Sequence, residues 1–184
     1  MRLNIYQEER KYQFYRNDED SPYLTGEVFW ASSKKPFGEI YDLENRPVAI
    51  LMNGESSSFW KKGKPTYFLY LDSEVVEVTV VSIWKGHWAF EYKGFHYNFY
   101  WHNGYKKSLF KSGEQVAKYD ARESYPLDPK KAFIVANNDE DHVLLLGLFL
   151  LFDKGSALDS ELPRNSAYLG RGVQECDYYW FPKR

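Results

Sequence analysis

Hydrophobic and polar residues alternate along much of this chain, as they do in strands that bury one face and expose the other. The clearest case is residues 95–101, where aromatic side chains occupy alternate positions and therefore share one face. Residues 74–84 are rich in β-branched types, which favour strands. The same criteria predict further strands at residues 26–31, 37–41, 47–52, 67–71, 105–110, 114–119 and 131–135.

Turn signals separate these segments at intervals of about 8 to 13 residues, which is typical of folds built from β-hairpins. Asn-Gly is the strongest of these signals, because both residues tolerate the positive φ of a type I′ turn. It occurs at Asn53-Gly54 and at Asn103-Gly104, and weaker signals occur at Lys93-Gly94 and Ser112-Gly113. Because closure removes exposed edges, we predict a closed antiparallel barrel of about 12 strands.

Residues 143–152 break the alternation, because every position in them is apolar or glycine. Leucine dominates this run, and leucine favours a helix over a strand. Asn137 and Glu140 resemble a capping box, and the acids at 139–141 suit the positive end of a helix dipole. Lys154 and Gly155 suit the last turn and the residue after it. We therefore predict a helix over about residues 139–153, with a buried central strand and a membrane dip as the other interpretations.

A helix without a polar face must be enclosed on all sides, and a barrel can enclose it. Gly147 would let the barrel wall approach closely. The predicted fold class is therefore all-β with one buried helix inside the barrel. We expect one domain over residues 1–184, with an atypical charged and Tyr-rich segment at 1–25. The tail at 156–184 would cover a barrel mouth or dock a partner.

Three segments resemble the tubby C-terminal-like superfamily, which includes tubby domains, phospholipid scramblases and LURP-one-related proteins. They are DEDHVLLLGLFLLFD at 139–153, IYDLENRPV at 40–48 and SLFKSGEQVAK at 108–118. The resemblance covers residues 26–155 and implies about twelve strands around a hydrophobic helix near the C-terminus. Since tubby domains bind phosphoinositides, it also implies contact with anionic lipid headgroups. The long tail after the helix departs from the family, and no lipid-contacting residue of the family is carried over to this chain.

Composition narrows the class of protein. The chain has 184 residues, 43% of them hydrophobic, which is ordinary for a globular protein. A formal net charge of −2 argues against a nucleic-acid binder. The single cysteine, Cys176, cannot form an internal disulfide. The N-terminus has no signal-like apolar core, and the apolar run is shorter than the roughly 20 residues of a membrane span. We expect a soluble, cytoplasmic protein that could lie at the membrane periphery.

Motifs for catalysis or metal binding are missing from the sequence: it has no phosphate-binding glycine loop, no H-E-x-x-H, no C-x-x-C and no G-x-S-x-G. His96 and His102 would lie about 20 Å apart on one strand, too far to share a metal. A two-residue turn at Lys93-Gly94 would pair His96 with Glu91 rather than with His87. The sequence therefore predicts a protein that is not an enzyme and that needs no metal and no cofactor.

Clustered lysines are the candidate site, as a patch for anionic headgroups; solvated turns and protected strand edges would also explain them. They are Lys61, Lys62, Lys64, Lys106, Lys107 and Lys111. The predicted function is a non-enzymatic binding protein that contacts an anionic phospholipid surface or a protein partner through its outer surface. One alternative is a carrier of a small hydrophobic ligand with an open, lipocalin-like barrel, which would need a polar stripe on the helix.

A carbohydrate-binding module is the other alternative. Aromatic side chains on strands could stack on sugars, although packing in the core explains such residues more simply. The candidates for such a platform are Phe59, Trp60, Trp84, Trp88, Tyr100 and Trp101.

Overall fold

The computed structural model describes residues 1–17, 19–29, 36–54, 66–72, 74–82, 85–102, 106–120, 131–158, 177 and 179–183. Within these residues the chain forms twelve strands and one helix, α1 (His142–Leu158). The strands are β1(Arg2–Glu8), β2(Lys11–Arg16), β3(Leu24–Val28), β4(Gly38–Tyr41), β5(Pro47–Asn53), β6(Thr66–Leu71), β7(Glu74–Ser82), β8(His87–Tyr92), β9(Phe95–Trp101), β10(Lys107–Lys111), β11(Glu114–Asp120) and β12(Lys131–Ala136).

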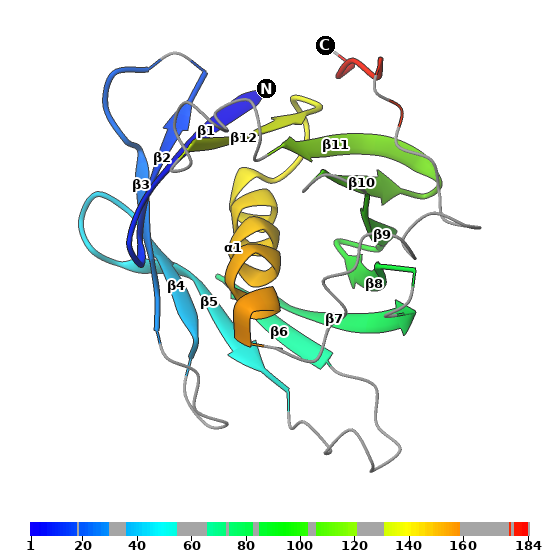
Figure 1. Ribbon diagram of the computed structural model, residues 1–184, viewed down its shortest axis with the longest axis horizontal. Helices are drawn as coiled ribbons and strands as arrows, with labels where there is room; N and C mark the ends of the chain where they lie inside the picture. The colour runs from blue at the N-terminus through cyan, green and yellow to red at the C-terminus, as the bar shows by residue number, and fades with distance from the viewer. Residues whose placement is uncertain are drawn as a thin grey trace.

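The strands form one closed barrel in which each strand pairs with its neighbours in sequence (Figure 1). All of the pairs are antiparallel, and β1 closes the barrel against β12, with Arg2 opposite Val135. The predicted fold class is therefore confirmed. Residues 1–25, for which the sequence analysis predicted no strand, form β1, β2 and the first residues of β3.

Two tight hairpins confirm the turn prediction. Lys93 and Gly94 have φ angles of 48° and 76°, and Ser112 and Gly113 have φ angles of 50° and 89°. Positive φ at both central residues is the geometry of a type I′ turn. The prediction for Asn53-Gly54 was wrong: β5 ends there, but the Gly54 N–H donates to the carbonyl of Thr66 at the start of β6, 2.8 Å away. Asn103-Gly104 lies outside the described residues.

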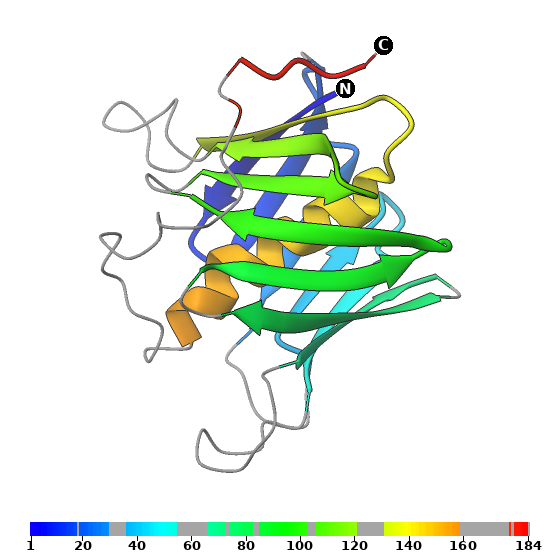
Figure 2. The same cartoon turned by 90° about the vertical axis from the view of Figure 1, so that its right-hand side faces the viewer.

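Helix α1 runs through the interior of the barrel, as Figures 1 and 2 show. It begins at His142 and continues to Leu158, past both Lys154 and Gly155, so the predicted ends at about 139 and 153 were wrong. Asp141 caps the helix instead of Asn137: its Oδ1 accepts the N–H groups of Val143 at 3.0 Å and Leu144 at 3.3 Å. These donors have no partner within the helix, so the cap satisfies them.

The barrel encloses α1 on every side. Every non-glycine side chain from Leu144 to Phe152 is at most 4% exposed. Aromatic rings reach the helix from several strands, with centroids 6.3 Å apart for Tyr12 and Phe149, and 4.7 Å for Trp88 and Phe152. The open barrel required by the alternative of a ligand carrier is therefore not observed. Among the described residues, no helix has the length and apolarity needed to cross a membrane.

Candidate binding site at the barrel rim

The structure describes three of the six candidate lysines, and these three lie in different surroundings. Lys107, at the start of β10, is only 6% exposed and points inward, with Nζ 6.0 Å from the ring centroid of Phe149 on α1. The Lys106 ammonium lies 3.8 Å from the carboxylate of Asp120. Lys111 lies at the other end of β10. The remaining three candidates, Lys61, Lys62 and Lys64, lie outside the described residues.

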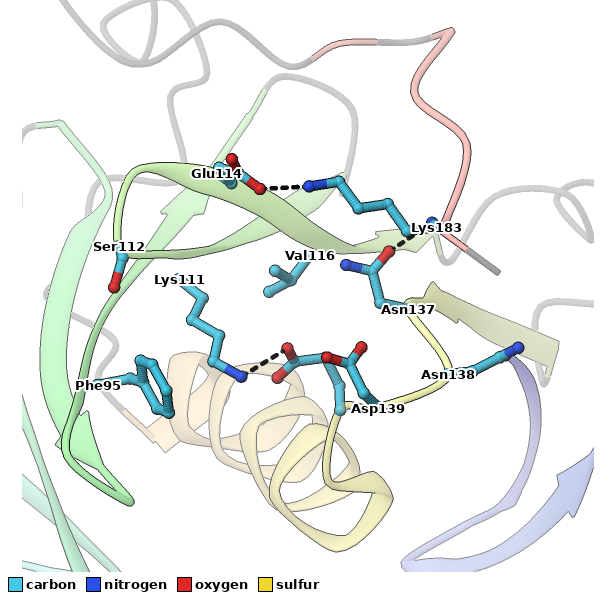
Figure 3. A pocket seen from close by; sticks show the side chains of 10 residues that line it. Phe95, Lys111, Ser112, Glu114, Val116, Asn137, Asn138, Asp139 and Lys183 are labelled. Carbon is cyan, nitrogen blue, oxygen red and sulfur yellow. Dashed lines mark hydrogen bonds and ion pairs between the residues drawn. The ribbon is translucent and has the colours of Figure 1, made fainter.

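A pocket of about 600 Å³ opens at the barrel rim where α1 begins, and Lys111 is one of its walls (Figure 3). We call it the rim pocket. It is bounded by the β9–β11 side of the barrel, by the loop before α1 and by the end of the chain. Its lining residues are Phe95, Lys111, Ser112, Glu114, Val116, Asn137, Asn138, Asp139, Glu140 and Lys183.

Inside the pocket, Glu140 is a carboxylate with only 2% of its side chain exposed. It accepts a hydrogen bond from the Tyr97 hydroxyl at 3.1 Å and pairs with the Lys111 ammonium at 3.2 Å. Burial and the neighbouring Glu140 charge raise the pKa of Tyr97, so its hydroxyl keeps its proton and donates. The Lys111 ammonium also lies 4.4 Å from the ring centroid of Phe95. Lys111 is thus paired with a buried carboxylate.

Beside the pocket, the helix cap carries a second ionic group. Asp141 accepts hydrogen bonds from the Tyr92 hydroxyl at 2.6 Å and the Lys93 ammonium at 3.0 Å. Burial alone would raise the pKa of Asp141, but these bonds and the Leu144 N–H hold it below its ordinary value. Burial and the bond to Asp141 raise the pKa of Tyr92 to about 12. This network fixes the start of α1 and therefore one edge of the pocket.

The C-terminal segment, which we define as residues 177 and 179–183, lies along the rim beside β11 (Figures 1 and 2). The Lys183 backbone N–H donates to Asn137 Oδ1 at 2.7 Å, and its ammonium lies 2.5 Å from a Glu114 carboxylate oxygen. Figure 3 shows the Lys183 side chain reaching toward Glu114 along the edge of the pocket. The Lys118 ammonium donates to the carbonyl of Trp180 at 3.2 Å.

This segment also presents aromatic side chains to solvent. Tyr179 is 86% exposed and Phe181 is 79% exposed. The Lys118 ammonium lies 5.8 Å from the Phe181 ring centroid. Tyrosine and phenylalanine side chains combine a large apolar ring with little conformational freedom, so this exposed pair could serve as a contact surface.

The remaining candidates give no second site in the described residues. Trp88 is 2% exposed and belongs to the core, whereas the Tyr100 ring stacks on His87 with centroids 4.4 Å apart. Phe59, Trp60 and Trp84 lie outside the described residues. His96 pairs with Glu91 as predicted, with Nδ1 2.6 Å from the carboxylate. No group of three or more His, Cys, Asp or Glu residues that could hold a metal occurs in the described part of the chain.

Sequence reasoning named Lys111 but missed the other parts of the rim pocket. Glu140 was taken for part of a capping box, and Glu114, Asn137 and Lys183 were not named as site residues. Comparisons with protein-family models, with curated proteins and with solved structures find no match.

Proposed function

We propose that this chain is a non-enzymatic binding protein of tubby-like fold that contacts an anionic phospholipid surface with the outside of its barrel. The observation that carries the proposal is the filled interior: α1 is enclosed on every side and occupies the lumen. A barrel filled by side chains has no room for a lipocalin-type ligand, so binding falls to the outer wall and the rims.

The exposed aromatic pair Tyr179 and Phe181 favours a lipid surface. Tyrosine and phenylalanine gain from entering the boundary between headgroups and acyl chains. The Lys118 ammonium lies beside Phe181, and a cation near an anionic membrane adds about 1 kcal/mol of binding. Lys61, Lys62 and Lys64 are a second candidate contact, since three neighbouring lysines would add to the same attraction.

Flotation with lipid vesicles tests this proposal. We expect the protein to float with phosphatidylcholine vesicles that contain phosphatidylserine or a phosphoinositide, and not with phosphatidylcholine alone. Raising the salt from about 0.1 M to 0.5 M should release it, because salt screens surface charges. Absence of flotation with every vesicle at both salt concentrations would refute the proposal.

Matched variants locate the contact. Replacing both Tyr179 and Phe181 by serine should weaken flotation even at low salt, because the apolar contribution is lost. Replacing Lys61, Lys62 and Lys64 by glutamine should mainly reduce the salt-dependent part. Leu43→Ser is the control, at a side chain that is 74% exposed in the turn before β5. It should change neither flotation at low salt nor the salt dependence of flotation.

A further inference from the structure

At the mouth of the rim pocket, the C-terminal segment places a lysine ammonium beside the Glu114 carboxylate. Lys183 is 2.5 Å from Glu114, and its pKa is raised first by that hydrogen bond and charge and also by Asp139. Deeper in the pocket Glu140 is already paired with Lys111. Within the described part of the chain, Asp139 makes no ion pair. Without Lys183, Glu114 would keep no ion-pair partner among the described residues.

The C-terminal segment leaves most of the pocket unfilled. The pocket retains about 600 Å³ with Lys183 in place, and its walls include the ring of Phe95 and the side chain of Val116. Phe95 is 47% exposed, so an apolar surface remains open there. Tyr179 and Phe181 do not cover it, since both face solvent, and Trp180 is not one of the residues that line the pocket. The pocket therefore has room for an apolar side chain that this segment does not supply.

We propose that the rim pocket is a docking site for a lysine-bearing peptide segment of a partner protein, and that the chain's own C-terminal segment occupies it in cis. The ammonium of the incoming lysine takes the place of Lys183 beside Glu114. A backbone N–H of the peptide donates to Asn137 Oδ1, as that of Lys183 does at 2.7 Å. A neighbouring apolar side chain packs on Phe95 and Val116.

Two features make a peptide the matching occupant. Asn137 is 5% exposed, and its Oδ1 accepts from a backbone amide, which a peptide offers and a simple cation does not. The Lys183–Glu114 pair that holds the cis segment has side chains 69% and 71% exposed. Exposed ion pairs are weak in water and are screened by salt, so a partner can displace this one. A partner peptide can therefore replace the C-terminal segment at this site.

The probe is a fluorescent peptide amide with the sequence of residues 177–183, Asp-Tyr-Tyr-Trp-Phe-Pro-Lys, titrated into the full chain. The Lys183–Glu114 pair that holds the tethered segment is exposed and weak, so Lys183→Gln should bind the probe about two- to fivefold more tightly than the wild type. A probe with glutamine in place of its lysine should bind about two- to fivefold more weakly to the same variant. Both substitutions avoid the barrel interior, and thermal unfolding checks that the variant is folded.

Charge reversal separates docking from a structural role. In the Lys183→Gln chain, Glu114→Lys should abolish binding of the lysine probe and should bind a probe with glutamate in its place. Glu74→Gln, at an exposed carboxylate on β7, is the control and should leave the affinity unchanged.

The proposal is overturned if the probe binds equally with and without Glu114, or fails to bind Lys183→Gln. A wild-type dimer that Lys183→Gln converts to monomer would also overturn it, because the occupant would then be the tail of a second copy. Since vesicle binding is tested at Tyr179 and Phe181, the two proposals can fail separately.

Discussion

Gly147 of α1 and Leu69 of β6 are in direct contact across the barrel interior. A Cβ built on Gly147 would lie 2.7 Å from Cδ1 and 2.8 Å from Cδ2 of Leu69, closer than atoms of this kind approach. Leu69 is fully buried, so its side chain has little room to move aside. The missing side chain at position 147 therefore sets how closely the helix can approach this wall, as the sequence led us to expect.

Gly147→Leu should destabilise the protein by about 2 kcal/mol or more, because the larger side chain overpacks the contact with Leu69. Gly147→Ala should cost less, since a gain in helix propensity of about 1 kcal/mol offsets part of the strain. Leu69→Ala alone should cost about 2–5 kcal/mol, the usual cost of a cavity. Urea unfolding of the single and double variants measures the coupling. Leu69→Ala should partly rescue Gly147→Leu, and additive effects would show that the two side chains do not compete for one space.

Shortening side chains on opposite faces of α1 tests whether the barrel wall packs against the helix on both sides. Leu144 and Leu146 are separated by about 200° around the helix, and both are fully buried. Leu144→Ala and Leu146→Ala should therefore each lower the free energy of unfolding by about 2–5 kcal/mol. Leu43→Ala, at a side chain 74% exposed, should stay within about 0.5 kcal/mol in the same assay. Tolerance at one of the two helix positions would mean that this face of α1 is not packed against the wall.

The enclosure of α1 was predictable, because a helix without a polar face has few alternatives. The start of the helix was not. Asn137, Asp139 and Asp141 are all favourable capping residues, and only the path of the loop decides which one reaches the free N–H groups. That path depends on Tyr92 and Lys93, which hold Asp141 from the β8–β9 hairpin. No local pattern in the sequence contains this information.

The candidate site was only partly predictable for a similar reason. Lys111 and Glu140 are distant in sequence and meet because the barrel brings the β10–β11 hairpin to the start of α1. The burial of Lys107 could have been predicted from the alternation in its strand. Lys107 and Leu109 are two residues apart, and alternate residues of a strand share a face. Strands β1 and β2 also alternate, with Leu3 and Ile5 buried in β1 and Tyr12 and Phe14 buried in β2. The charged residues around them made this alternation hard to recognise in the sequence.

Asp141→Ala should destabilise the protein by about 1–2 kcal/mol at pH 7, because α1 loses its N-cap. Asp141→Asn should cost less, since asparagine keeps the cap and loses the charge and the acceptor for Tyr92 and Lys93. The folded state lowers the pKa of Asp141, so the charge contributes stability above the unfolded value of about 3.9. This contribution disappears as the pH falls through the folded pKa. Unfolding measured from pH 7 down to pH 3 should therefore show the wild type and Asp141→Asn converging, and a constant difference would contradict the assignment.

Lys111→Met should destabilise the protein by about 3 kcal/mol, because among the described residues it leaves the buried Glu140 carboxylate with the Tyr97 hydroxyl as its one partner. Adding Glu140→Gln removes the unpaired charge, so the double variant should be more stable than Lys111→Met alone. Urea unfolding measures both changes.

The same variants test whether Lys111 belongs to the lipid contact. Since Lys111 is paired with Glu140, the double variant should float with anionic vesicles as the wild type does. A variant of unchanged stability that no longer floats would instead place Lys111 in the lipid contact and make its pairing with Glu140 incidental.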